Sequence, residues 1–464
     1  MSQPNILLIV SDDHGYGDLS FRGINNDART PNLDRLASDG MVFDQAYVSA
    51  PICSPSRAGL ITGAYQQRWG ARWFDSSQFA PAPFQTIPQV LKSAGYRTGY
   101  FGKVHYGGDD DYGSRGCPDQ HGFDDAFFGL AGLSMGRLHY LTHGEQYEEE
   151  YGDAAQAMGV QPMVENGEKV SCEKHLTVEF ADRAIAFMED AVGADQPFFC
   201  MVAFNAVHNF TWQLPDFELD QRGLPQHPDF DADTSKYLDW YDGVVSPNLH
   251  NGREYYLAQL DIMDREIGRL TQHLEAFGQR DNTMIVYLTD NGGSTCNYGD
   301  NAPLRGTKYS LYEGGIRVPF IISWPGVITP GGRSDALVSS LDLLPTFAAA
   351  AGATLPKDSP VDGLDLRHVC EGDEADAHES LFFDTGFQWA VRTKDWKLRW
   401  ADEQSPVRQH LIDVEHTDIG SGLSLTPLGS SVDESPEADV SADYPEVVDK
   451  LLQLREQWLE TISH

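Results

Sequence analysis

The feature that most constrains the fold is an alternation of strand-length apolar runs with helical stretches along the first three quarters of the chain. In residues 30–40, for example, Thr30 can cap a helix, Pro31 fits its first turn and Gly40 can end it. Strands that alternate with helices favour a mostly parallel central sheet with helices on both faces, an α/β fold. The strand-length runs are residues 5–10, 97–103, 197–204 and 283–290, and the later helical stretches are about 173–191 and 253–277.

The pattern changes near residue 355. Residues 380–386 and 388–400 favour short antiparallel strands, and residues 444–462 show the spacing of a closing amphipathic helix. We therefore expect a catalytic unit over residues 1–355 and a smaller C-terminal α+β subdomain with an antiparallel sheet over residues 356–464.

The charge of the chain excludes several classes of partner. It has 33 Lys and Arg against 70 Asp and Glu, a formal net charge of −37. Nucleic acids and acidic membrane surfaces both attract clustered Lys and Arg, so we expect neither as a partner. No apolar run has the length of a membrane span, and the first run begins at Asn5, which leaves no room for a signal peptide. The sequence therefore predicts a cytoplasmic protein, or alternatively a periplasmic or secreted one whose signal has been removed.

Oxygen-bearing side chains follow two of the predicted strands. Asp12 and Asp13 come after the first run, and Asp290 and Asn291 end a later one. Taken singly, each pair is an ordinary loop or turn sequence. Because the carboxyl ends of parallel strands meet at one edge of a sheet, we expect the four side chains to lie together, where a divalent cation would offset their repulsion. Oxygen ligands suit Ca²⁺, and as second choice Mg²⁺, better than Zn²⁺.

A cysteine precedes a segment with the pattern of a helix start. Ser54 can cap this helix and Pro55 can take its first position, so Cys53 would lie near backbone N–H groups that favour an anion. A lone cysteine is usually a small buried side chain, and lone Lys or His residues are usually surface or structural groups. Several basic residues nevertheless lie near the predicted strand ends and the cysteine, and together they predict a site for a multiply negative tetrahedral group. They are Arg57, Lys103, His105, His208 and Lys308.

Six segments resemble, in order, those of the type I sulfatases of the alkaline-phosphatase superfamily. They are NILLIVSDDHGYGDLS, TPNLDRLASDGMVFDQAYVSAPICSPSRAGLITG, GYRTGYFGKVHYG, PFFCMVAFNAVH, LTDNGG and KYSLYEGGIRVPFIISWPG. Two positions depart from the family pattern, Val104 where Trp is common and Val207 where Pro is often found. Neither replaces a catalytic group, so the departures bear on the shape of the substrate pocket.

The resemblance implies that Cys53 is oxidised to formylglycine by a dedicated partner, a formylglycine-generating or anaerobic sulfatase-maturating enzyme. One hydroxyl of the hydrated aldehyde would attack sulfur, and the other would expel sulfate and regenerate the aldehyde. The metal ligands implied for calcium are Asp12, Asp13, Asp290, Asn291 and the group made from Cys53.

The resemblance also implies roles for the basic residues. Arg57 would orient the formylglycine, while Lys103 and Lys308 would balance the charge of the sulfate. His208, with Lys308, would protonate the leaving oxygen, and His105 would take the proton that triggers sulfate release.

We expect the substrate to be a sulfated carbohydrate, captured locally as a short chain or terminal sugar. Two long connections, residues 106–170 and 209–250, are polar and rich in groups that bind sugars, although ordinary loop packing is the alternative. The candidate substrate-binding residues are Arg72, Trp73, Arg137, His139, Tyr140 and Trp212.

Three other functions remain possible from the sequence. A phosphodiesterase or phosphonate monoester hydrolase of the same superfamily would use the same nucleophile and metal. A non-catalytic, calcium-dependent glycan-binding module would have no use for the basic residues. A cysteine hydrolase acting through Cys53 directly would leave the metal ligands unexplained.

Overall fold

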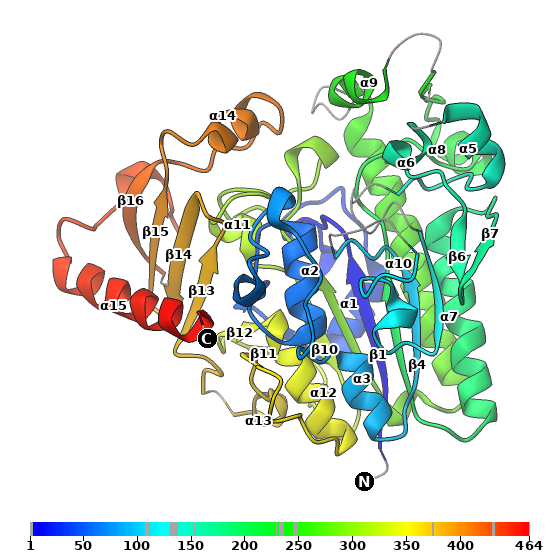
Figure 1. Ribbon diagram of the computed structural model, residues 1–464, viewed down its shortest axis with the longest axis horizontal. Coiled ribbons are helices and arrows are strands. Elements are labelled where there is room, and N and C mark those ends of the chain that lie inside the picture. The colour runs from blue at the N-terminus through cyan, green and yellow to red at the C-terminus, as the bar shows by residue number, and fades with distance from the viewer. Residues whose placement is uncertain are drawn as a thin grey trace.

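A mixed sheet of ten strands forms the centre of the part of the chain that the structure describes, residues 3–106, 112–129, 138–152, 154–228, 230–231, 236–244, 249–373, 375–428 and 432–463 (Figure 1). This computed structural model has the strand order β11-β2-β10-β9-β1-β8-β4-β5-β6-β7. The five middle strands run parallel, which confirms the predicted α/β fold with a mostly parallel sheet. These strands are β9 (Thr283–Thr289), β1 (Asn5–Ser11), β8 (Phe198–Ala203), β4 (Arg97–Gly102) and β5 (Asp125–Gly129).

Antiparallel pairs occur toward the two edges of the sheet. On one side β10 pairs antiparallel with both β9 and β2, and β11 then pairs parallel with β2. On the other side β6 and β7 form a hairpin beside β5. The edge strands are β10 (Phe320–Ser323), β2 (Met41–Phe43), β11 (Gly332–Ser334), β6 (Met163–Glu165) and β7 (Glu168–Val170).

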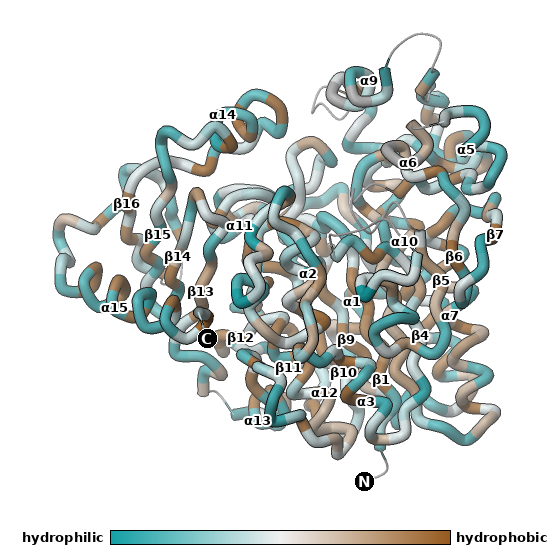
Figure 2. The backbone as a smooth tube through the Cα atoms, in the orientation of Figure 1, coloured by the Kyte–Doolittle hydropathy of each residue, from teal (hydrophilic) through white to brown (hydrophobic). Residues whose placement is uncertain are grey.

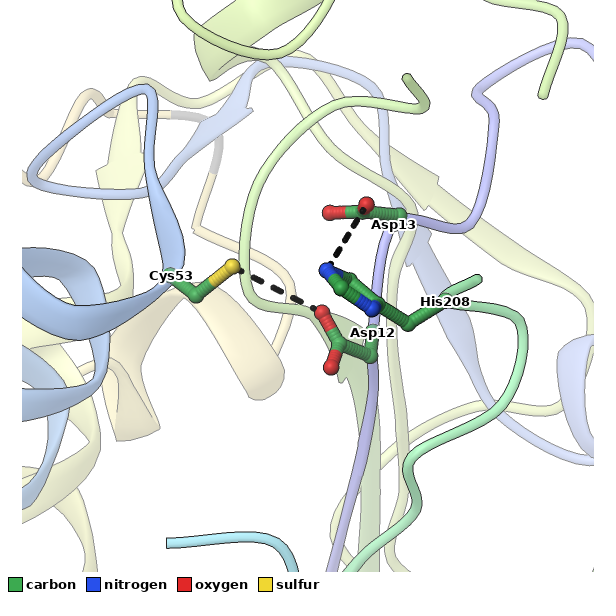
Figure 3. Close-up of side chains that lie close together, drawn as sticks. All are labelled: Asp12, Asp13, Cys53 and His208. Atoms are coloured by element: carbon green, nitrogen blue, oxygen red, sulfur yellow. Dashed lines mark hydrogen bonds and ion pairs between the residues drawn. The ribbon is translucent and has the colours of Figure 1, made fainter. Parts of the chain in front are cut away.

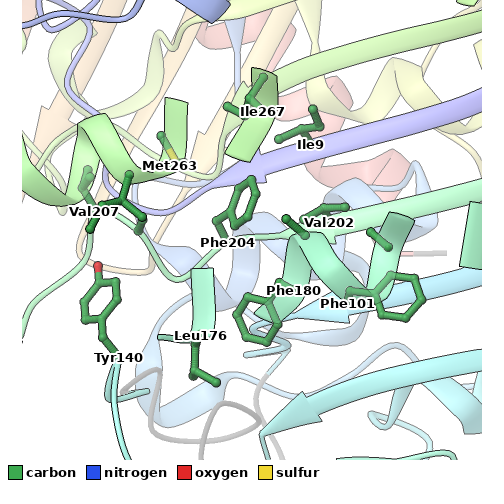
Figure 4. Close-up of a cluster of buried hydrophobic side chains, with 14 of the residues drawn as sticks. Ile9, Phe101, Tyr140, Leu176, Phe180, Val202, Phe204, Val207, Met263 and Ile267 are labelled. Atoms are coloured by element: carbon green, nitrogen blue, oxygen red, sulfur yellow. The ribbon is translucent and has the colours of Figure 1, made fainter. Parts of the chain in front are cut away.

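Helices cover both faces of this sheet because its central strands are apolar on both sides. In β1, Leu7 and Ile9 point to one hydrophobic core and Ile6 and Leu8 to the other, as the two-residue period of a strand requires. Figure 4 shows the first core, and Figure 2 shows hydrophobic residues concentrated along the strands. The first core contains α1 (Pro31–Ser38), α7 (Leu176–Gly193) and α10 (Gly252–Ala276), and the second contains α2 (Cys53–Thr62), α3 (Ile87–Ser93) and α12 (Leu343–Ala351).

Local sequence signals explain where several of these helices begin and end. Helix α1 starts at Pro31, as expected, but the Thr30 side chain before it makes no capping hydrogen bond. Helix α3 has a capping box in which the Thr86 hydroxyl accepts from the Gln89 backbone N–H, an arrangement that stabilises a helix by about 1 kcal/mol. Gly63 ends α2 with a φ of 62°, a conformation that glycine adopts readily.

A second, antiparallel sheet lies beside the first and contains the strands expected near residues 380–400 (Figure 1). Helix α15 (Pro445–Ile462) packs across it through Leu451 and Trp458. The sheet consists of β13 (Ser380–Asp384), β14 (Gln388–Thr393), β15 (Trp396–Ala401) and β16 (Gly422–Pro427), the last of which the sequence did not predict.

Shorter elements connect these layers. No helix within the described ranges combines the length and apolar character needed to cross a membrane. The shorter elements are α5 (Glu145–Tyr151), α6 (Ala154–Met158), α8 (Asp216–Arg222), α9 (Tyr237–Val244), α11 (Glu313–Ile316), α13 (Arg367–Cys370), α14 (Pro406–Asp413), β3 (Ala46–Tyr47), β12 (Val338–Ser339), and the 3₁₀ helices η1 (Ser20–Arg22) and η3 (Phe74–Ser76).

Candidate active site

The loops after β1, β8 and β9 meet at the carboxyl edge of the central sheet. Backbone hydrogen bonds join the first two loops, from Asp12 N–H to Ala206 O at 2.8 Å and from Val207 N–H to Asp12 O at 2.7 Å. The Asp290 N–H donates to Ser11 O at 3.1 Å and so attaches the third loop. These bonds hold the side chains that follow the strands in one place, as the parallel sheet predicts.

Cys53 is the first residue of α2, which corrects the predicted start of this helix. We expected Ser54 as cap and Pro55 as first residue, but Ile52 precedes the helix and makes no side-chain cap. The Ser54 hydroxyl instead hydrogen-bonds the hydroxyl of Ser77. Since Cys53 lies in the first turn, its side chain is still near backbone N–H groups that have no partner within the helix.

The Cys53 thiol is buried against a carboxylate. Only 1 % of the residue is exposed, and its Sγ lies 3.7 Å from Oδ1 of Asp12. Burial raises the pKa of the thiol above its ordinary range, although Lys308 and Lys103 act in the opposite direction. The unmodified side chain is therefore a neutral thiol, which disfavours a cysteine hydrolase that attacks through a thiolate.

Arg57 links two of the predicted metal ligands. Its Nε donates to Oδ2 of Asp290 at 2.7 Å, its Nη2 lies 3.6 Å from Oδ2 of Asp12, and its Nη1 donates to the Lys103 carbonyl at 3.2 Å. The Lys103 ammonium itself contacts Asp12. Burial and then the Asp290 charge raise the pKa of Asp12, whereas Arg57 and Lys103 outweigh burial at Asp290 and lower its pKa.

Asp13 is the centre of the remaining contacts. Lys308 Nζ donates to its Oδ2 at 2.9 Å and Asn291 Nδ2 to its Oδ1 at 2.6 Å. Asn297, which the sequence analysis missed, donates through Nδ2 to the same Oδ2 at 2.5 Å. The signal for Asn297 was its place in the polar loop that directly follows Asp290 and Asn291. Burial acts to lower the pKa of Lys308, but the negative groups around it, Asp13 first, together outweigh burial and keep the lysine protonated.

His208 completes the group that Figure 3 shows, with Asp12, Asp13 and Cys53 around it. Its Nε2 lies 3.7 Å from Oδ2 of Asp13. Burial, then Lys103 and Lys308, lower the pKa of His208 well below its ordinary value, so the imidazole is neutral.

His105 is buried close to these groups. It adopts a φ of 45°, so the chain after β4 does not continue the extended geometry that would place Lys103 and His105 on one side. His105 nevertheless contributes to the lowered pKa of His208, after burial, Lys103 and Lys308.

The residues present fit a divalent cation. One ligand atom from each of Asp12, Asp13, Cys53 and His208 lies within 4.8 Å of the others. Among the described residues, the buried Oδ1 of Asn291 has no hydrogen-bond partner, and a buried amide oxygen left in this way is costly unless a ligand meets it. His208, expected to serve as an acid, lies within this group of possible ligands. Asp290, expected to be a metal ligand, is not in the group, and its carboxylate accepts a hydrogen bond from Arg57.

Most of the candidate sugar-binding residues are packed inside the protein. Four of them are buried, as expected if they serve in ordinary loop packing: Trp73, His139, Tyr140 and Trp212. Tyr140 donates its hydroxyl hydrogen to the carbonyls of Asn205 and His208, at 3.1 and 2.9 Å, and so supports the loop after β8.

Two neighbouring side chains in the segment around η3 are exposed instead. Arg72 has 41 % of its side chain exposed, near Asp384, and Phe74 is 49 % exposed. Phe74 packs on Trp73 and Tyr309 and was not among the predicted residues. The remaining candidate, Arg137, lies outside the described residues.

The sheet order, with carboxylates, cations and a cysteine buried at its carboxyl edge, defines the class: an enzyme of the alkaline-phosphatase superfamily. Within this class the chain belongs to the sulfatase family, whose model, described as "Sulfatase", matches residues 4–353. A second model, "N-sulphoglucosamine sulphohydrolase, C-terminal", matches residues 307–406.

Individual relatives agree with this assignment. Human arylsulfatase A is 31 % identical over 479 residues, which cover 97 % of this chain and 87 % of that protein. The solved structure of Ps i-CgsB in complex with k-i-k-neocarrahexaose is 29 % identical, with a TM-score of 0.79, over 98 % of this chain and 93 % of that one. The phosphonate monoester hydrolase of Agrobacterium radiobacter, 20 % identical with a TM-score of 0.64 over 98 % of this chain and 96 % of that one, shares the fold. The protein is therefore a sulfatase.

Proposed function

We propose that the protein hydrolyses a sulfate ester of a carbohydrate through a formylglycine made from Cys53. The observation that carries this proposal is the surrounding of Cys53: a helix start, three buried carboxylates and three buried cations, all at the carboxyl edge of one sheet. Fixed buried cations stabilise the charge of a sulfate ester more strongly than they would in water.

The proposed metal is calcium, held by Asp12, Asp13, Asp290, Asn291 and the oxygen of the modified Cys53. The unpartnered Oδ1 of Asn291 supports this set, because calcium accepts amide as well as carboxylate oxygens. A bound divalent cation would act as a Lewis acid toward the oxygens of the sulfate group.

The modification also requires a partner. The hydrated aldehyde supplies two hydroxyl groups on one carbon, one to attack sulfur and one to release sulfate. Because Cys53 is 1 % exposed, another enzyme can reach it only before the chain has folded, which supports a formylglycine-generating or anaerobic maturating enzyme acting during biosynthesis.

The surrounding side chains divide the remaining tasks. Arg57, fixed by Asp290 and the Lys103 carbonyl, orients the modified residue, and Lys103 and Lys308 balance the charge of the sulfate. Lys308, which is protonated, supplies the proton for the leaving oxygen, and the neutral His208, which also lies near Asp13, relays it. The last task, removal of the hydroxyl proton that allows sulfate to leave, belongs to His105.

The carbohydrate part of the proposal rests on an exposed aromatic ring beside the site. Phe74 packs against Tyr309, whose backbone N–H donates to the Pro51 carbonyl at 2.7 Å, two residues before Cys53. An exposed ring in this position can stack on a sugar, with Arg72 at its side. The saccharide bound by Ps i-CgsB is in line with such a substrate.

The test combines mass analysis with a comparison of rates. Peptide mass spectrometry of fully active protein should find an aldehyde at position 53, and sulfated mono- and disaccharides should be hydrolysed faster than 4-nitrophenyl sulfate and 4-nitrophenyl phosphate. Fully active protein with only an unmodified thiol would disprove the mechanism. A faster phosphate ester would point to the phosphodiesterase alternative, and a faster aryl sulfate would remove the carbohydrate claim.

The rate on a long sulfated polymer tests how the substrate is captured. With a net charge of −37, the protein repels a polyanion at low ionic strength, so we expect a small sulfated unit to be hydrolysed at least as fast. A strong preference for the polymer under these conditions would contradict capture of a short chain or terminal sugar.

A further inference from the structure

A cavity of about 570 Å³ lies between the β11 edge of the central sheet and the second sheet, and it shares no residue with the site around Cys53. Its lining residues come mainly from η1, the loop between β2 and β3, strand β11, and strand β14 with the turn that follows it, and Arg317 after α11 adds to them. In Figure 1 the second sheet lies beside the end of the central sheet that β11 forms. A cavity of this volume is large enough for a small-molecule ligand.

Positive charge predominates in this cavity although the chain as a whole is strongly acidic. Its cationic lining residues are Arg22, Arg317, Arg333, Arg392 and Lys394, and its acidic ones are Asp44, Asp335 and Asp395. Arg22 and Arg333 share one carboxylate, that of Asp44, at 3.3 and 2.7 Å. Lys394 pairs with Asp376, which does not line the cavity. The lining therefore carries more positive than negative charge.

Two of these arginines have buried donors without acceptors. Within the described residues, Nε and Nη2 of Arg22 and Nη1 of Arg392 make no hydrogen bond. Their side chains are 6 % and 1 % exposed. Burial lowers the pKa of Arg22, with Tyr16 and Asp44 opposing, which shows how strongly its charge is desolvated. Buried charged donors are costly to leave unsatisfied, so these atoms indicate a missing acceptor.

We propose that the cavity binds a tetrahedral oxyanion of the sulfate type, as the free ion or as an ester on a sugar. Three donors on two separate guanidinium groups match an anion with oxygens in several directions better than a planar carboxylate, which one guanidinium can bind alone. An adjoining cavity of about 400 Å³, which shares Arg333 and Lys394, has room for the rest of an ester. This binding does not depend on the chemistry proposed at Cys53.

The test locates a heavy sulfate analogue in crystals of the full chain. Crystals soaked in sodium selenate should show anomalous selenium peaks both beside Cys53 and between Arg22 and Arg392. The absence of a peak in the cavity, at selenate concentrations that fill the site beside Cys53, would overturn the proposal. A second soak with galactose 6-sulfate separates the two sources: sugar density in the cavity assigns the ester, and a selenate peak without sugar density assigns the free ion.

Variants then connect the peak to the named side chains. Arg22→Gln should weaken selenate binding in the cavity about tenfold or more while the peak beside Cys53 stays unchanged. Arg333→Gln, whose side chain is 57 % exposed, should fold normally and weaken binding in the same direction. Lys92→Gln is the matched control, since Lys92 is 43 % exposed and pairs with Asp124 away from the cavity. Unchanged cavity binding in both arginine variants would overturn the assignment.

Discussion

Two groups of buried charges lie only a few residues apart in the sequence, and they differ in how completely their acceptor oxygens are paired. At the junction with the second sheet, Glu313 of α11 accepts from the Tyr47 hydroxyl at 2.5 Å and from Lys397 at 3.0 Å. Arg317 and Arg392 lie within 3.8 Å of the same carboxylate. Both carboxylate oxygens of Glu313 are thus occupied by protein groups.

The group around Cys53 is different because it keeps unpaired acceptor oxygens. Oδ1 of Asn291, Oδ1 of Asn297 and Nη2 of Arg57 are buried and, among the described residues, make no hydrogen bond. Buried polar groups are usually satisfied in folded proteins, so a cluster of unpaired atoms beside buried charges is a place where a ligand can supply the partner. The comparison teaches that burial and charge alone do not identify a functional site, and that unpaired acceptors within the charge cluster are the additional feature here.

The largest expected effect is on turnover. Cys53→Ala should lower kcat by roughly a thousandfold or more, because it removes the source of the nucleophile, and should leave the unfolding temperature nearly unchanged. The matched control is Cys172→Ala, another buried cysteine, which should keep full activity. Substantial turnover by Cys53→Ala protein would show that the group around Cys53 is not the catalytic one, and its contrast with the Glu313 group would no longer hold.

The next effect is on stability at the junction of the sheets. Glu313→Ala leaves Lys397, Arg392 and Arg317 without their shared carboxylate and should reduce the free energy of unfolding by about 3–5 kcal/mol, measured in urea. The exposed Glu456→Ala on α15 should change it by less than about 0.5 kcal/mol. If Glu313→Ala is no more destabilising than Glu456→Ala, the cluster does not hold the two sheets together.

Loss of the unpaired amide oxygen should weaken metal binding. Asn291→Leu should reduce bound calcium, measured by elemental analysis, with a loss of affinity of about 10- to 100-fold. Asn32→Leu is the control, since the Asn32 amide already donates to Asp264 at 2.8 Å. Metal content that is unchanged in Asn291→Leu protein would remove Asn291 from the proposed ligand set.

The charge cluster at Glu313 also predicts an acid dependence of stability. Burial acts to raise the pKa of Glu313, but Lys397 and then Arg392 outweigh it and hold the pKa below the ordinary value of 4.5. Ionised Glu313 therefore stabilises the folded state above about pH 4.5, and this contribution is lost as the pH falls toward the lower folded-state pKa. The stability difference between wild type and Glu313→Gln should shrink over that range in urea titrations. A difference that stays constant would contradict the ionised pairing.

The smallest effect is expected at the edge of the site. Phe74→Ala should raise KM for a sulfated sugar about two- to tenfold and leave kcat and the unfolding temperature nearly unchanged, because one stacking contact is lost. Phe217→Ala is the control, since Phe217 is 64 % exposed on α8. An equal rise in KM in both variants would show that Phe74 has no special part in binding.

Most of the fold could be predicted because its signals are local. The apolar runs of β1, β8 and β9 and the Thr-Pro start of α1 are explicit in a few neighbouring residues. The start of α2 was misplaced because Ser54, a favourable capping residue, hydrogen-bonds the distant Ser77 instead. Such long-range contacts are not encoded in local sequence patterns.

The candidate site also contains residues that local sequence signals could predict and residues that depend on long-range contacts. Asp12, Asp13 and Asp290 were predictable because polar residues after parallel strands must meet at one edge. Asn297 was missed because it lies in a loop without periodicity, and the burial of Trp73 depends on Tyr309 and Phe387, more than 200 residues away in the sequence. Which aromatic residue is exposed is decided by that packing, so the sequence could not distinguish Trp73 from Phe74.

Gly292, which follows Asn291, lies in close contact with α11, and this contact matters for protein engineering. A side chain at Gly292 would place its Cβ 1.8 Å from the Gly314 carbonyl oxygen, and Gly314 directly follows Glu313. The strands that carry Lys397 and Arg392 are thus connected, through one helical turn, to the loop that carries Asn291. A chimera that takes residues 380–427 from another sulfatase must bring its partners for Glu313 as a matched set, because α11, which carries Glu313, makes a close backbone contact with the loop that carries Asn291.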